Sequence, residues 1–112
     1  MQKYDLRNQA LSSEDGEHIF GAEDTGSHAC YMIYGILKPG ETKRLIRPGK
    51  GHEEMVLTMK GDLEISGHVS GHLDEGSAIH IIGDASAYLE NTGLAEAAYV
   101  IAGGHSTQGH QH

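Results

Sequence analysis

Glycine-containing turn signals divide this chain into short segments, and their spacing limits the possible folds more than any other feature. The chain has 16 glycines in 112 residues. Turn signals stand at Pro39-Gly40, Pro48-Gly49, Gly61-Asp62, Gly83-Asp84 and Asn91-Thr92-Gly93. Between them, apolar and polar residues alternate as in β-strands, and no window of about 11 residues follows the period of a helix. The pattern predicts an all-β domain, either a sandwich or a small barrel.

The sequence pattern divides the chain into three parts: an arm, a barrel and a tail. Residues 1–27 are polar and predict an N-terminal arm with one short strand near His18-Ile19-Phe20. Residues 28–102 hold the barrel, in which we expect buried strands at 28–38 and 78–82. Residues 103–112 predict a flexible tail that also holds His105, and its His-x-His pair, His110 and His112, could chelate a metal ion weakly. The remaining strands are expected at 41–47, 54–59, 63–65, 87–90 and 95–102.

Composition and charge narrow the class of protein. The formal net charge of −8 disfavours nucleic-acid binding, because phosphate contacts need a basic face. The single cysteine, Cys30, forms no disulfide within the chain, and we expect it to be a small buried hydrophobe. Residues 1–7 lack the apolar core of a secretory signal, and no run reaches the roughly 18 apolar residues of a membrane span. We therefore expect a cytoplasmic protein without membrane contact.

Two stretches resemble the paired motifs of the cupin superfamily. In the first motif a glutamate follows a His-x-His pair and precedes a glycine by seven residues, as Glu54 precedes Gly61 here. The second motif runs from a glycine to an asparagine, and Gly76 and Asn91 stand at the full spacing. The resemblance covers roughly residues 30–102. It implies a jelly-roll fold, the double-stranded β-helix, and a homodimer formed through edge strands.

The resemblance also implies a metal site of three histidines and one glutamate, and most of that set is missing. The first-motif histidine positions hold Pro48 and Lys50, and the second-motif position holds Ala87, so that only Glu54 remains. One carboxylate cannot hold a transition metal ion tightly, and a nearby ammonium repels cations. We therefore expect no metal at the family site and no cofactor.

Nearby histidines leave an alternative open. His52, Glu54 and His80 would form a non-standard site for one divalent transition metal, if the two strands that carry them lie side by side. The resemblance then implies an enzyme of the isomerase, lyase or dioxygenase type.

A basic stretch suggests a different ligand. Five of the eight basic residues lie between Lys38 and Lys50, and they form either a solvated strand edge or an anion-binding wall. If alternation holds, Arg44 and Lys50 point into the barrel with Glu54, where together with His80 they would bind a small anionic metabolite. Alternatively, Lys50 and Glu54 pair and plug the barrel. The candidates for metal-free acid–base catalysis are Lys50, Glu54, His80 and Tyr88.

Overall fold

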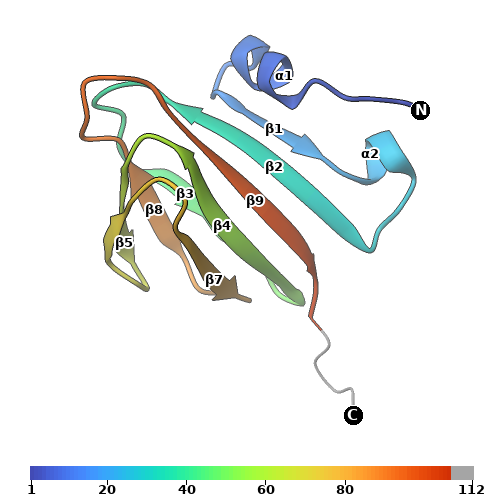
Figure 1. Cartoon of the computed structure of the whole chain (residues 1–112). Coiled ribbons are helices and arrows are strands. Elements are labelled where there is room, and N and C mark those ends of the chain that lie inside the picture. The colour runs from blue at the N-terminus through green and yellow to red at the C-terminus, as the bar shows by residue number, and fades with distance from the viewer. Residues whose placement is uncertain (107–112) are drawn as a thin grey trace.

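Two antiparallel sheets face each other in the computed structural model, which describes residues 1–106 (Figure 1). The five-stranded sheet has the order β1 (Glu17–Phe20), β2 (Cys30–Leu37), β9 (Ala97–His105), β4 (His52–Lys60) and β7 (Ala78–Ile82). The four-stranded sheet has the order β3 (Arg44–Ile46), β8 (Ala87–Glu90), β5 (Leu63–Gly67) and β6 (Gly71–Leu73). Neighbours in each sheet are often distant in sequence, as in a jelly roll. The predicted all-β class is confirmed.

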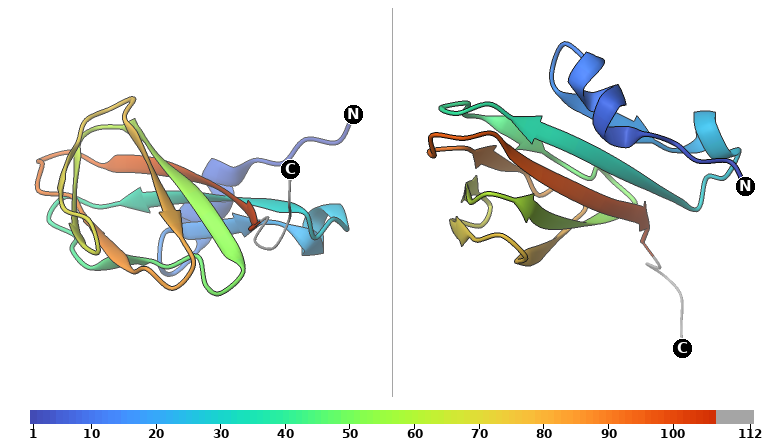
Figure 2. Two further views of the ribbon diagram at one scale, coloured as in Figure 1. Left: turned by 90° about the horizontal axis from the view of Figure 1, so that it is seen from below. Right: turned by 45° about the horizontal axis from the view of Figure 1, so that its top comes forward.

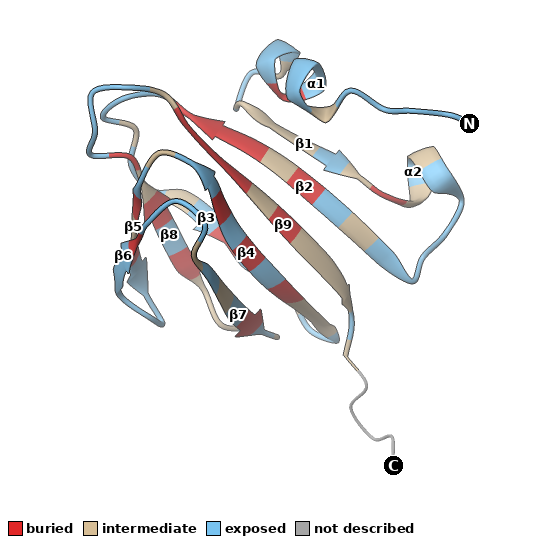
Figure 3. Ribbon diagram, in the orientation of Figure 1, coloured by how far each residue is buried: buried red, intermediate tan, exposed pale blue. Residues whose placement is uncertain are grey.

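The hydrophobic core lies between the inner faces of the two sheets. Along β4, Val56 and Thr58 are fully buried, whereas Met55, Leu57 and Met59 between and beyond them are exposed on the outer face (Figure 3). This period of two is the one that the sequence showed. The core side chains come from both sheets and include Ile33, Leu37, Ile46, Leu63, Ile65, Ile81, Leu89, Tyr99 and Ile101.

The N-terminal segment is more structured than the sequence predicted. Its expected strand is present as β1, which pairs with β2 and so joins the five-stranded sheet. Two helices flank it, α1 (Leu6–Ser12) and α2 (Ala22–Thr25), and they lie to one side of the two sheets (Figure 2). They were missed because seven and four residues are too few to show helical periodicity. No helix within residues 1–106 is long and apolar enough to cross a membrane.

Three expectations about individual segments were wrong. Cys30 is exposed, because it begins β2 on the outer face of the sheet. Only Ile81 of residues 78–82 is buried, because β7 is an edge strand whose outer face is uncovered. The last strand runs through His105, beyond the expected start of the tail at residue 103. His110 and His112 lie outside the described residues.

Candidate functional site

A tyrosine and a glutamate bridge three strands on the inner face of the five-stranded sheet. Tyr31 of β2, Gly103 of β9 and Glu54 of β4 lie in one cross-strand row. The Tyr31 ring lies over Gly103, where a Cβ atom would come within 2.2 Å of it, and the hydroxyl donates to Glu54 Oε2 at 2.5 Å. A glycine inside a strand often marks such a close approach. The row therefore ties β2 to β4 across the intervening strand.

Burial controls the protonation of this pair. Glu54 is only 5% exposed, and burial raises its pKa, although the Tyr31 hydroxyl and nearby His52 favour the charged form. Burial, and then the bond to Glu54, raise the pKa of Tyr31 far above its usual range. The raised pKa keeps the Tyr31 hydroxyl protonated as the donor, and the Glu54 carboxyl group accepts.

Two histidines lie next to this row at the same end of the sheet. His52 of β4 and His105 of β9 are direct partners in the ladder, with ring centres 4.8 Å apart. Nε2 of His105 is 2.6 Å from the backbone oxygen of His28. His52 is half-buried and His105 is exposed. Sequence reasoning named His52 but placed His105 in the tail.

A second tyrosine bridge fills the inner face further along the sheet. The Tyr99 ring of β9 lies over Gly35 of β2, and its hydroxyl bonds to Glu17 of β1. Burial raises the pKa of Tyr99. The two bridges run in opposite directions, since β9 is the crossed strand in one and supplies the tyrosine in the other.

Arg44 belongs to this second bridge and is not free to bind an anion. Its side chain is only 9% exposed, and Nη1 donates to the Tyr99 hydroxyl at 2.9 Å. Nη2 donates to Glu41 at 2.7 Å and to the backbone oxygens of Asp15 and Ile36 at 2.6 and 3.0 Å. These contacts stabilise the fold and leave little for a ligand.

The other predicted site residues are dispersed. Lys50 is exposed in the turn between β3 and β4, because β3 ends at Ile46 and the alternation stops there. Tyr88 is 40% exposed, on the outer face of the four-stranded sheet. The structure therefore gathers neither the expected anion-binding set of Arg44, Lys50, Glu54 and His80 nor the expected catalytic set of Lys50, Glu54, His80 and Tyr88.

The alternative metal site is also wrong. Glu54 is paired with Ile81 and Met55 with His80, so His80 points to the outer face and Glu54 to the inner face. His80 Nε2 instead contacts Glu53 Oε1 at 2.8 Å. Within residues 1–106, no group of three or more His, Cys, Asp or Glu side chains is placed to hold a metal ion. The family's ligand positions do not fit a metal either, since Ala87 is a buried core residue and Lys50 faces solvent.

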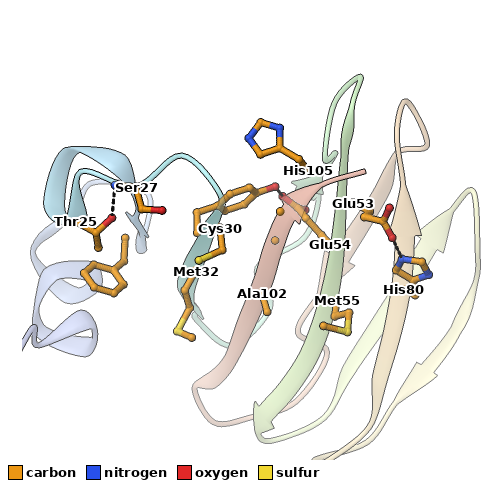
Figure 4. A pocket seen from close by; sticks show the side chains of 14 residues that line it. Thr25, Ser27, Cys30, Met32, Glu53, Glu54, Met55, His80, Ala102 and His105 are labelled. Carbon is orange, nitrogen blue, oxygen red and sulfur yellow. Dashed lines mark hydrogen bonds and ion pairs between the residues drawn. The ribbon is translucent and has the colours of Figure 1, made fainter. Parts of the chain in front are cut away.

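A hollow of about 680 Å³ lies on the five-stranded sheet (Figure 4). Its floor is β9, where Ala102, Gly103 and Gly104 present almost no side chain. Met32 of β2 and Met55 of β4 flank Ala102, because the three residues form one row on the outer face. The remaining lining comes from Cys30, Tyr31, Glu53, Glu54, His80, His105 and, at the α2 side, Phe20, Thr25 and Ser27.

Sequence reasoning missed this hollow, although the Ala-Gly-Gly run gave a signal for it. Three consecutive small residues at the end of an apolar strand leave space between their neighbours. The sequence pattern instead predicts that the last strand ends at Ala102 and that the two glycines begin the tail.

No family model and no curated protein matches the sequence. Solved structures do match the fold. The protein TT1209 from Thermus thermophilus is 16% identical over 94% of this chain and 98% of its own, with a TM-score of 0.69. The Cupin_2 domain of an XRE family transcriptional regulator from Enterobacter cloacae is 18% identical over 80% of this chain and 97% of its own, with a TM-score of 0.65.

A third match is described as a predicted oxalate decarboxylase from Thermotoga maritima. It is 16% identical over 80% of this chain and 81% of its own, with a TM-score of 0.66. Identities this low support the fold and nothing finer. With the motif spacing and the jelly-roll topology, they show that the chain has the fold of the cupin superfamily.

Proposed function

We propose that this protein binds a small, mostly apolar molecule in the hollow on its five-stranded sheet. The observation that carries the proposal is the lining, in which Phe20, Met32, Met55 and Ala102 surround a space of about 680 Å³. Spaces of roughly 300–1,000 Å³ with apolar walls and a few polar groups are typical of small-molecule sites.

The charges around the hollow change the expected ligand class. Within residues 1–106, no lysine or arginine lines the hollow, whereas Glu53 and Glu54 do. The whole chain also carries a net charge of −8. An anionic metabolite would meet repulsion here, since the two cations expected to bind it, Arg44 and Lys50, lie elsewhere. A neutral or weakly basic molecule suits this surface better.

The Glu53–His80 pair supplies a polar contact at one wall. Because Nε2 of His80 contacts the Glu53 carboxylate, its Nδ1 is left for a ligand. A ligand with an apolar body and one hydrogen-bonding group would match this arrangement.

The matched structures include both an oxalate decarboxylase and a domain of a transcriptional regulator. We favour binding over catalysis here because the candidate catalytic side chains lie apart. Glu54 is buried on the inner face and Lys50 is in a turn, while His80 and Tyr88 are on the outer faces of different sheets.

Titration with Nile red, a neutral apolar dye, tests the proposal. Ala102→Leu fills the floor of the hollow, and Val100→Leu adds the same kind of bulk two residues earlier on the same outer face, outside the hollow. We expect saturable binding of one dye per chain, about tenfold weaker in Ala102→Leu and unchanged in Val100→Leu, in fluorescence titrations. Equal binding by the parent protein and Ala102→Leu would overturn the proposal.

A further inference from the structure

We infer that His52 and His105 form a binding site for one divalent transition metal ion, at positions different from those of the cupin motif. The two residues are direct partners on neighbouring antiparallel strands, β4 and β9, and their side chains leave the same face of the sheet. The proposal is independent of the apolar ligand, since it rests on the imidazole pair alone.

The spacing of the rings matches shared coordination. Two imidazoles that bind one ion do so at metal–nitrogen distances of about 2.0–2.1 Å. Their ring centres are then roughly 4.5–5.2 Å apart, for nitrogen–metal–nitrogen angles between a right angle and the tetrahedral angle. The observed separation between the ring centres of His52 and His105 is 4.8 Å. The strand register thus brings the rings to coordination distance without a change in the backbone.

A backbone contact prepares one ring for this role. A carbonyl oxygen only accepts hydrogen bonds, so the 2.6 Å contact between Nε2 of His105 and the His28 oxygen requires the proton to be on Nε2. In the neutral ring, Nδ1 then carries the free lone pair. Metal-binding histidines commonly use the other ring nitrogen in this way, to donate to a carbonyl oxygen that fixes the tautomer.

The surroundings favour a cation with open coordination positions. Glu54 lies two residues after His52 on the same inner face, and its charge interacts with that of His52. His105 is exposed, so water can complete the coordination. Two neutral imidazoles with oxygen ligands suit Zn²⁺, Ni²⁺ or Cu²⁺ better than Mg²⁺ or Ca²⁺.

Calorimetric titration with Zn²⁺ tests the site. The starting protein is the full chain with His110→Asn and His112→Asn, so that these two histidines, which lie outside the described residues, cannot bind the ion. We expect one Zn²⁺ per chain and at least a tenfold loss of affinity in both His52→Gln and His105→Gln. His80→Gln is the matched control, because it removes an imidazole from the opposite face of the same sheet.

Nitrogen NMR of the histidine side chains provides a second readout that does not depend on the variants folding well. In the starting protein we expect Zn²⁺ to shift Nδ1 of His105, while Nε2 keeps its proton. The proposal is overturned if Zn²⁺ leaves the His52 and His105 resonances unchanged, or if His80→Gln weakens binding as much as His52→Gln does.

Discussion

The hydroxyl of Tyr31 reaches across β9 at Gly103, which has no side chain, and bonds to Glu54, the residue that aligns with the glutamate of the cupin motif. In this protein Glu54 is a buried member of a side-chain pair. We therefore expect substitutions of Glu54 or its partner to change the free energy of unfolding, which can be measured.

Removal of the Tyr31 hydroxyl is expected to destabilise the protein. In Tyr31→Phe the buried Glu54 carboxyl loses its hydrogen-bond donor, at a cost of about 1–3 kcal/mol in the free energy of unfolding. The loss should be larger at about pH 8 than at about pH 5, because the charged carboxylate needs the donor more. Urea unfolding at both pH values measures this. Tyr88→Phe, which removes an exposed hydroxyl, should change little.

Neutralising Glu54 is expected to alter the pH dependence of stability. Burial raises the pKa of Glu54 above its ordinary value of 4.5, so the folded chain keeps this proton to a higher pH than the unfolded chain does. Stability from this group is therefore greatest below pH 4.5 and falls as the pH rises through the folded pKa. Glu54→Gln should flatten this part of the profile and raise the free energy of unfolding at neutral pH, because no buried charge is then formed. An identical profile in Glu54→Gln and the parent would contradict the prediction.

A side chain at Gly103 is expected to collide with the Tyr31 ring. An added Cβ would meet ring atoms at 2.2 and 2.4 Å, so Gly103→Ala should cost about 1–3 kcal/mol in unfolding free energy. The cost should shrink when Tyr31 is also alanine, because the colliding ring is gone. A double-mutant cycle measures this coupling. Additive effects of the two substitutions would show that the ring does not limit residue 103.

Arg44 and Lys50, two cations expected to bind the same ligand, should differ sharply in their effect on folding. Arg44→Met leaves Glu17 and Glu41 without their cation and should destabilise the protein by about 3–5 kcal/mol. Lys50→Ala removes an exposed charge and should change stability by less than about 0.5 kcal/mol. Thermal unfolding distinguishes the two, and comparable losses would show that Lys50 also has structural contacts.

The expected homodimer remains a prediction, and the outer face of the five-stranded sheet is where we would look for it. Leu57, Met59 and Ile82 are between 36% and 56% exposed there, on neighbouring strands and outside the hollow. Exposed apolar patches commonly mark protein–protein contacts. Analytical ultracentrifugation should show a dimer that Leu57→Glu converts to a monomer, whereas Leu45→Glu, on the four-stranded sheet, leaves it intact. A parent protein that is monomeric would contradict this prediction.

The fold could be predicted because the motif residues that this chain keeps are those that shape the backbone. Gly61 and Gly76 have positive φ angles of 77° and 89°, which other residues rarely adopt. Asn91 is 1% exposed and donates to the backbone oxygens of Leu37 and Ala95. None of these turn contacts involves the positions where the resemblance implies histidine, which hold Pro48, Lys50 and Ala87. The fold thus does not require histidine there.

The candidate sites were harder to predict because they depend on which face of a strand each residue occupies. A single uncertain strand end decides whether His80 meets Glu54 or Glu53, and the register gives Glu53. His105 was assigned to the tail because two glycines precede it, although those glycines make room for the Tyr31 ring and for the backbone of Ala29. Contacts between residues so distant in sequence leave no local pattern.

The opposed tyrosine bridges also have a consequence for folding. A slip of β9 by one residue against β2 would turn Tyr99 toward the outer face, opposite Tyr34 or Ile36 instead of Gly35, and would put Ala102 or Gly104 opposite Tyr31 instead of Gly103. The Tyr99 bridge and its bond to Glu17 would be lost in either direction, and the slip that brings Ala102 opposite Tyr31 would also obstruct the bridge to Glu54. Misaligned pairings of these two strands thereby lose at least one buried tyrosine bridge, which favours a single native alignment during assembly of the sheet.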